Sequence, residues 1–418
     1  MKMKIILMMV ATLLLTGCVG LFGPDKEGWK FSQKNEFLKI LEKDTYMSLC
    51  NQKPLYERVK VTRNSKMMNK LLLAYINNLA NSCIDFKDFD ASQQRKKSNE
   101  IDTYYEAYKE IIDPKIINMK LRAGESIENI LKPYIPTTPQ FKALVAKYKI
   151  FTAKEHNITE KQLKKIRLNI ERTKIMKSNI GTNYALINVP EFVVRLIEHG
   201  STSLKFNVIV GKTNMQTPIF SEKLQYVEIN PQWNVPDSIM RKSYIPKIQK
   251  NPNWVASKGM ELHKESYDLK SPKIDPKTVD WSKYPKDEKG YIPYKLVQVP
   301  SLKNGLGRVK FIFPNKHAVY MHDTQVKSLF NRHVRAFSHG CVRLSKPKKL
   351  LHYLTTNYTN KQIVTVENWY NSMKTKHLIL SQSLQVHMAY LTAYVDEKNH
   401  LTMFNDIYGF DASQKLNF

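Results

Sequence analysis

Cysteine is scarce in this 418-residue chain, and its spacing excludes the usual zinc sites. The four cysteines are Cys18, Cys50, Cys83 and Cys341. No two of them are spaced as C-x-x-C, and no two histidines as H-x-x-x-H, so these two ligand pairs of structural zinc sites are missing. The G-x-S-x-G, H-E-x-x-H and G-x-x-x-x-G-K-[ST] motifs are absent as well. We therefore expect neither a metal nor an organic cofactor.

Long hydrophobic runs are also lacking. The apolar run Ile5–Leu15 follows two lysines and is shorter than the roughly 20 residues of a spanning helix. It is typical of a secretory signal peptide, residues 1–17. Leu15-Thr16-Gly17-Cys18 is similar to a lipobox, which predicts lipidation of Cys18 and attachment to a membrane. The alternative is an ordinary signal with a coincidental cysteine. Val19, in place of a retaining aspartate, favours the outer membrane, facing the periplasm of a Gram-negative bacterium.

The segment Ser338–Leu344 (SHGCVRL) carries the strongest chemical signal. It places Cys341 after Gly340, and His322 lies 19 residues upstream. A free thiol has a pKa near ~8.5, which a neighbouring imidazole can lower to roughly 3.5–7.5. A thiolate–imidazolium pair attacks carbonyl carbon to form a thioester. The interval fits a strand end, a loop and a return strand that bring both side chains to one cleft.

At these residues the chain resembles the L,D-transpeptidases, which cross-link peptidoglycan. The likeness to the large proteobacterial type covers about 167–411, with a fainter echo at 131–148. It runs through several blocks in order, which are YALINVP (184–190), VIVGKTNMQTPIF (208–220), NPQWNVPDSI (230–239), GLGRVKFIFP (305–314) and AYVDEKNHLTMFNDIY (393–408).

The resemblance assigns roles to the central residues. Cys341 is the nucleophile, and His322 is the base that takes the thiol proton and later protonates the departing amine. In the family a backbone carbonyl just after the histidine orients the ring, and it maps to Asp323. Gly340 allows close approach of the backbone, so the amides of Gly340 and Cys341 are expected to face a developing oxyanion.

Three further residues of the motif are expected to support this site. His339 fits a hydrogen-bonding scaffold better than a second base. Arg343 either lowers the thiol pKa or braces the loop. Ser338 supports the turn through its hydroxyl group.

The pattern of apolar residues predicts an α+β chain with two domains. Residues 18–30 form a lipid-anchored linker, and 31–150 read as helices, including Ile101–Ile112. Residues 151–411 are expected to form a mainly β catalytic domain, sandwich or barrel-like, with a lid-like insertion at about 240–300 and a tail at 412–418. Expected strands include Phe192–Ile197 paired with Leu204–Val210, and Ile363–Val366; Ser345 is the expected N-cap of a helix.

The resemblance implies an acyltransferase. Cys341 would attack the carbonyl of the third stem-peptide residue, diaminopimelate, and release D-alanine; a neighbouring stem amine then resolves the thioester into a three-to-three cross-link. Such enzymes are acylated by carbapenems. Water as the acceptor would give an L,D-carboxypeptidase, and a lysine side chain a lipoprotein-attaching enzyme. A non-catalytic wall-binding lipoprotein is the rival from another class.

Acidic residues are few. The 66 basic and 37 acidic residues give a net charge of +29. For an exported chain this excess suits an anionic cell-wall polymer better than nucleic acid, and a lysine-rich surface bias explains it equally well. Two cysteines remain, Cys50 and Cys83, either as a disulfide suited to an oxidising compartment or as two buried thiols.

Overall fold

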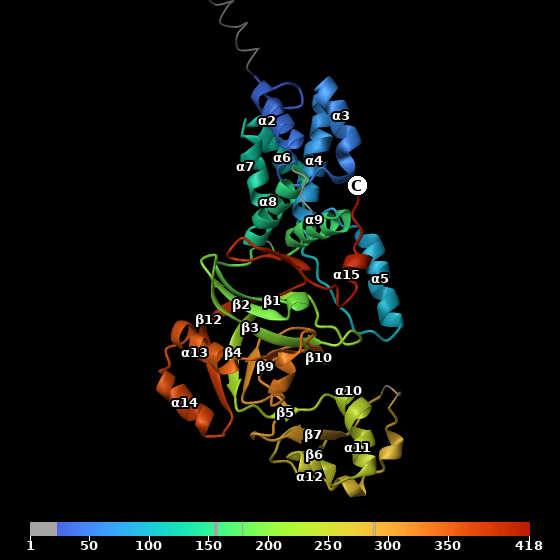
Figure 1. The fold of residues 1–418 in the computed structure, drawn as a ribbon, viewed down its shortest axis with the longest axis vertical. Helices are drawn as coiled ribbons and strands as arrows, with labels where there is room; N and C mark the ends of the chain where they lie inside the picture. The colour runs from blue at the N-terminus through green and yellow to red at the C-terminus, as the bar shows by residue number, and fades with distance from the viewer. Residues whose placement is uncertain (1–22, 154–157, 178, 287, 289) are drawn as a thin grey trace, which may run out of the picture. The chain divides into compact units, whose positions relative to one another are not determined.

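The computed structural model describes residues 23–153, 158–177, 179–286, 288 and 290–418. Cys18 and the expected signal peptide lie outside these residues. Among the described helices, none combines the length and apolar character needed to cross a bilayer. The chain forms two compact units (Figure 1). We call them the helical unit, which contains residues up to 95, 106–180 and 391–418, and the sheet unit, which contains 96–105 and 181–390.

The helical unit buries the apolar faces of its helices. In its longest helix, α4 (Ser65–Asn81), Asn64 caps the start by accepting a hydrogen bond from the Met67 amide, and Leu71, Tyr75 and Leu79 are fully buried. The other helices are α2 (Phe31–Glu42), α3 (Lys53–Thr62), α5 (Phe86–Ser98), α6 (Pro114–Arg122), α7 (Ile127–Leu131), α8 (Pro139–Ala153), α9 (Glu160–Lys174) and α15 (Phe410–Ser413), joined by the strands β13 (Ala393–Val395) and β14 (Leu401–Met403).

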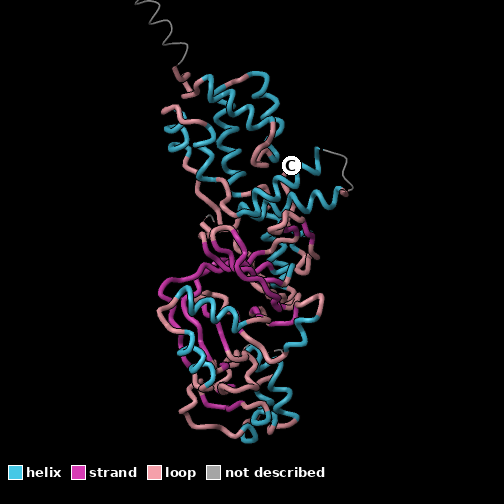
Figure 2. Tube along the Cα trace, turned by 60° about the vertical axis from the view of Figure 1, so that its left-hand side comes forward, coloured by secondary structure: helices cyan, strands magenta, loops and turns pink. Residues whose placement is uncertain are grey.

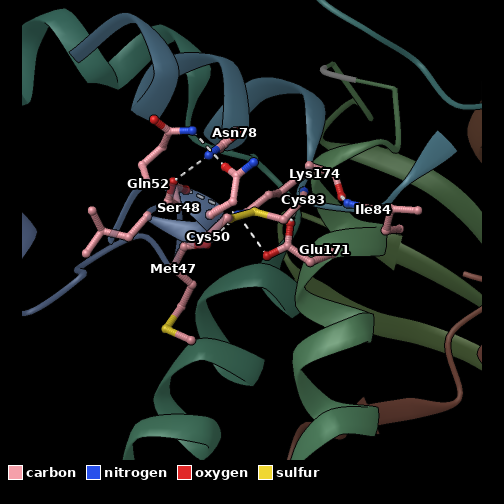
Figure 3. Close-up of a disulfide and its surroundings, with 12 residues drawn as sticks. Met47, Ser48, Cys50, Gln52, Asn78, Cys83, Ile84, Glu171 and Lys174 are labelled. Atoms are coloured by element: carbon pink, nitrogen blue, oxygen red, sulfur yellow. Dashed lines mark hydrogen bonds and ion pairs between the residues drawn. A yellow bond between two sulfur atoms is a disulfide. The ribbon is translucent and has the colours of Figure 1, made fainter. Parts of the chain in front are cut away.

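Cys50 and Cys83 form a disulfide inside the helical unit, as Figure 3 shows, with Cα atoms 6.2 Å apart. Three charged residues of α9 lie beside it: Glu171 pairs with Arg167 at 2.9 Å and with Lys174 at 3.0 Å. Burial opposes ionisation of Glu171, but Lys174 and Arg167 outweigh it and lower its pKa. These cysteines and Glu171 are the cluster with metal-ligand geometry among the described residues, and the disulfide already occupies both sulfurs.

The sheet unit is built on a nine-stranded sheet in the order β10-β3-β11-β9-β8-β4-β12-β1-β2. Because β2 also pairs with β3, the sheet closes on itself. The strands, coloured magenta in Figure 2, are β1 (Asn183–Asn188), β2 (Val193–Glu198), β3 (Ser201–Gly211), β4 (Ser221–Ile229), β8 (Val309–Ile312), β9 (Met321–His322), β10 (Ala336–Ser338), β11 (Val342–Leu344) and β12 (Lys376–Ala389).

The predicted fold class is confirmed: a barrel-like β unit with few helices follows a helical N-terminal part. The predicted hairpin is confirmed too, since β2 and β3 pair antiparallel. Three local predictions are wrong. Ile363–Val366 begins a helix, α14 (Ile363–Asn371), not a strand. The helix α13 (Pro347–Tyr358) has Lys346 rather than Ser345 at its N-cap, without a side-chain hydrogen bond.

The third difference concerns the expected helix at 101–112. There the chain is extended: the Asp102 amide donates to the Asn214 carbonyl at 3.0 Å, and Ile219 donates to the Tyr104 carbonyl at 3.0 Å. This pairing places Lys96–Tyr105 in the sheet unit. Conversely α9 and the segment from Leu391 belong to the helical unit, because Ile166, Ile170, Ala393 and Val395 share its core. The units therefore do not follow the expected boundary near 150.

The insertion is a small folded body of its own. Its strands β5 (Trp233–Asn234), β6 (Met260–Lys264) and β7 (Tyr294–Gln298) form a sheet in the order β5-β7-β6. The short helices α10 (Asp237–Ile239), α11 (Ile245–Lys250) and α12 (Trp254–Ser257) cover an apolar cluster that includes Ile248, Leu262 and Trp281. Despite its lysine-rich and polar sequence, this segment has a hydrophobic core.

Candidate active site

Strand register brings the predicted site residues together. In the parallel pair β9–β11, Met321 lies beside Val342 and His322 beside Arg343. Met321 and Val342 are fully buried, so they point to the interior. Because side chains alternate along a strand, His322 and Arg343 point to the opposite face. Cys341 directly precedes Val342 and is directed to this same face.

The turn that carries Cys341 depends on Gly340 and Ser338. Gly340 has a φ of +109°, a conformation that other residues rarely adopt. The Ser338 hydroxyl donates to the Cys341 carbonyl at 2.6 Å and accepts from the Gly340 amide at 3.1 Å. Thr217 donates to the Gly340 carbonyl at 2.8 Å. Ser338 thus braces the turn in the way expected from the sequence.

The same hydrogen bonds change the expected oxyanion site. The Gly340 amide already donates to the Ser338 hydroxyl, so it does not point freely at a reacting carbonyl. For the Gly340 amide to serve a developing oxyanion, as expected from the sequence, it would have to exchange this hydrogen bond for one to the substrate.

The His322 ring is held by backbone carbonyl groups. Its Nδ1 donates to the carbonyl of Asp323 at 2.5 Å, which leaves the other ring nitrogen as the basic one. The carbonyl of Leu306 is a further backbone partner of the ring. Burial, assisted by the positive charge of Arg343, lowers the pKa of His322 to about 3. The imidazole is therefore neutral at pH 7.

The carboxylate of Asp323 supports the backbone rather than the chemistry. It accepts from the Arg308 amide at 2.9 Å and the Thr324 amide at 2.7 Å, and it pairs with Lys327. Gly307, with a φ of +66°, lies so close that an added Cβ would meet this carboxylate at 2.3 Å. The carbonyl that orients His322 is thereby fixed from both sides.

The Cys341 thiol is partly buried and neutral in the free protein. It donates to the Ala318 carbonyl at 4.0 Å. Burial raises the pKa of the thiol, while the Tyr320 backbone, Lys310, the Tyr320 hydroxyl and Arg343 act in the opposite direction. The sequence led us to expect a lowered thiol pKa. The structure shows the reverse, because desolvation of the thiolate outweighs the nearby positive charges.

Tyr320 is a neighbour of the thiol that sequence reasoning missed. Its hydroxyl interacts with Cys341, and its ring packs edge-on against His322 with centroids 5.6 Å apart. Burial raises the pKa of Tyr320 well above its usual value. The signal was present in the sequence: Tyr320 lies two residues before His322, which places both side chains on one face of a strand.

The site residues line one cavity of about 1300 Å³. Ser338, His339, Cys341, Arg343 and His322 contribute to its wall, whereas Gly340 and Asp323 act from behind it. His339 has a pKa lowered by burial and by Lys212 and Arg343, which keeps it neutral. Burial also lowers the pKa of Arg343. The Nε atom of Arg343 is buried without a hydrogen-bond partner among the described residues.

The insertion and an N-terminal segment complete the wall of this cavity. Trp233, Tyr244 and Lys247 of the insertion line it. The Lys247 ammonium lies 5.5 Å from the Tyr244 ring centre, and the rings of Trp233 and Tyr244 are 6.1 Å apart. Glu100 and Asp102 line another part. The cavity can therefore hold a ligand much larger than the reacting carbonyl.

Known proteins match this unit. Residues 182–366 match the model of the YkuD family, the L,D-transpeptidase catalytic domain. A curated Haemophilus influenzae protein, named provisionally as an L,D-transpeptidase, is 31% identical over 296 residues, which cover 70% of this chain and 55% of the relative. The chain thus spans about half the length of that relative.

Solved structures show a distant likeness. An L,D-transpeptidase from Mycobacterium smegmatis is 12% identical, with 49% of this chain and 58% of that chain covered and a TM-score of 0.23. One from Enterococcus faecium is 8% identical, with 71% and 99% covered and a TM-score of 0.22. Scores this low add no argument about the site.

Proposed function

Because residues 182–366 match the L,D-transpeptidase catalytic domain, we propose that this chain cross-links peptidoglycan with Cys341 as its nucleophile. One observation carries the proposal. Cys341, which directly precedes β11, and His322, on the neighbouring strand β9, line one cavity, and the Asp323 carbonyl holds the imidazole in the tautomer of a base. A wall-binding protein without activity needs none of these features.

The protonation states of the free site define the first step. Since thiol and imidazole are both neutral, His322 takes the thiol proton while Sγ attacks the carbonyl of the third stem-peptide residue. The C–S bond forms, and the Cys341 amide stabilises the oxyanion. The intermediate collapses as the C–N bond to D-alanine breaks. His322 returns the proton to the departing amine, and the thioester remains.

The acceptor then completes the reaction. The amine of a neighbouring stem attacks the thioester carbon, His322 accepts its proton, and the C–S bond breaks to release a three-to-three cross-link. The proton returns to the sulfur, so the free enzyme is restored. Water in place of the amine would release a tripeptide, and a lipoprotein lysine would be joined to the wall instead. The cavity of about 1300 Å³ favours a large acceptor such as a second stem, which supports the cross-linking reaction.

Two measurements on the purified protein test this proposal. Intact mass spectrometry should show one meropenem adduct on the wild type and none on Cys341→Ala. Absence of an adduct from the wild type would favour the non-catalytic alternative. Incubation with stem tetrapeptides should then yield cross-linked dimer. Formation of tripeptide alone would make the protein an L,D-carboxypeptidase and contradict the cross-linking assignment.

We further propose that the protein is exported and anchored in the outer membrane through a lipid on Cys18. The Cys50–Cys83 disulfide supports export, because such bonds persist in oxidising compartments. Labelled palmitate should enter the wild type and not Cys18→Ser when both are expressed in a Gram-negative host. Equal labelling of the two would contradict lipidation at this residue.

A further inference from the structure

A row of ionisable side chains crosses the sheet beside the reactive thiol. In neighbouring strands Arg343 lies beside His322, His322 opposite Lys310, Lys310 opposite Glu228, and Glu228 opposite His377. Residues paired in this way point to the same face of a sheet. All five line the cavity that contains Cys341. The mechanism uses His322 and leaves the charges on β8 and β4 without a role.

Lys310 and Glu228 form an ion pair that belongs to the cavity wall. Nζ and Oε2 are 3.7 Å apart, and the side chains are only 20% and 16% exposed. The Lys310 ammonium also lies 4.3 Å from the centre of the Tyr320 ring. Since Tyr320 contacts Cys341, Lys310 is held between Glu228 and the aromatic neighbour of the thiol. The positive charge of Lys310 lies close enough to Cys341 to counteract part of the increase in the thiol pKa that burial causes.

A long, partly exposed ion pair at this place can exchange partners with a ligand. The separation of 3.7 Å is longer than the roughly 2.7–2.9 Å of a tight charge-assisted hydrogen bond, so neither group is saturated. Lys310 can donate to a carboxylate while Glu228 accepts from an ammonium group. A group with both charges on one carbon, the zwitterionic end of an amino acid, satisfies both residues together. A ligand with an amine alone brings its positive charge close to the positive charge of Lys310 and offers that residue no carboxylate.

The position of the pair suits the side chain of the donor residue. Strands are about 4.8 Å apart, so β8 lies roughly 10 Å from β11. A four-carbon side chain on the acylated residue, together with the lysine arm, bridges that interval. We propose that Lys310 and Glu228 form a specificity site for a zwitterionic amino-acid group at the end of the donor's third side chain. This inference rests on the proposed function and names the donor that the site selects.

The test compares three donor tetrapeptides that differ in one group. In the first donor the side chain of the third residue ends in an amine and a carboxylate. In the second donor that carboxylate is amidated. In the third donor the side chain ends in an amine alone, as in lysine. Selectivity is the ratio of kcat/KM for the zwitterionic donor to that for each other donor. Such a ratio cancels any general loss of reactivity that follows from the effect of Lys310 on the thiol.

We expect wild-type selectivity of about tenfold to a hundredfold, the usual effect of a hydrogen bond to a charged partner. Lys310→Met should abolish discrimination against the amidated donor. Glu228→Gln should raise KM for all three donors, because each carries the amine. Lys223→Met should leave the discrimination against the amidated donor in place. Lys223 is an exposed lysine on β4 that does not line the cavity. It controls for the loss of one positive charge.

The outcomes separate this inference from the proposed function. A wild type that turns over all three donors equally would overturn the specificity site while leaving the transpeptidase intact. Selectivity that survives in Lys310→Met would also overturn it, because the pair would then be a structural ion pair. A wild type that reacts with none of the donors contradicts the proposed function itself. Circular dichroism of each variant identifies any loss of folding.

Discussion

At the scale of single residues, the site works by desolvation as much as by charge. Burial lowers the pKa of His322 and raises that of Cys341, so both groups are uncharged before substrate arrives. An ion pair formed in advance would need solvation that this cavity does not supply. The proton therefore moves during attack. A buried, neutral base held by the Asp323 carbonyl is suited to that step.

The pH dependence of acylation tests these protonation states. His322 has a pKa of about 3, so the rate of meropenem acylation should stay flat from about pH 4.5 to neutrality. Stopped-flow fluorescence can follow the reaction. A sigmoidal rise centred near the ordinary histidine value of about 6.5 would contradict a neutral, buried imidazole.

Folding stability offers an independent check on His322. The unfolded chain protonates this residue near pH 6.5 and the folded one near pH 3. The unfolded state therefore binds more protons between these values, and the neutral ring's contribution is lost as the pH falls through that window. His322→Gln should weaken the dependence of Tm on pH there. An identical pH profile for the variant would show that His322 is not desolvated.

Gly307 controls the orientation of the histidine from a distance. In Gly307→Ala the new methyl group would meet the Asp323 carboxylate at 2.3 Å and displace it. We expect acylation to fall by about tenfold or more, since small displacements at a site are costly. Gly259→Ala is the matched control, because its φ of +63° is similar and nothing lies within 4 Å. Equal effects of the two substitutions would assign the loss to backbone strain alone.

At the scale of elements, the motif of the site was readable from the sequence and its surroundings were not. Residues 338–344 and His322 can be recognised from residue type and sequence order alone. The positions of Lys310 and Glu228 depend on the register of β4, β8 and β9, which only pairing between distant strands defines. Ile363–Val366 was misjudged because β-branched residues favour strands only weakly, and packing in α14 buries Val366.

The insertion is an element whose own core should control substrate binding. Ile248 is fully buried on α11, next to Lys247 of the cavity wall. Ile248→Ala should lower stability by about 2–5 kcal/mol and raise KM for stem peptides. Ile379→Ala, at a site 66% exposed on β12, is the control. An unchanged KM in a destabilised Ile248→Ala protein would show that the insertion does not contribute to binding.

At the scale of the whole molecule, each unit is stabilised in its own way. The sheet unit closes its sheet through β2 and β3, whereas the helical unit joins Cys50 to Cys83 across a sequence separation of 33. A loop of this length predicts roughly 3–4 kcal/mol of stabilisation through the unfolded state. The double variant Cys50→Ser/Cys83→Ser should lose that amount and still be acylated by meropenem.

Hydrogen exchange locates the effect of that double variant. Faster exchange should be confined to the helical unit, around α4 and α9, where the disulfide lies. Denaturant unfolding gives the size of the loss, with the reduced wild type as a second reference. Unchanged stability, or loss of acylation together with faster exchange in the sheet unit, would contradict this division of roles.

The acyl-enzyme itself provides the most direct measurement. The protein is incubated with a stem tetrapeptide without acceptor, quenched in acid and digested, and the modified peptide is sequenced by mass spectrometry. We predict a thioester-linked tripeptide on Cys341, with D-alanine released in equal amount. A tripeptide attached to any other residue, or D-alanine released by Cys341→Ala at the wild-type rate, would contradict the assignment of Cys341 as the nucleophile.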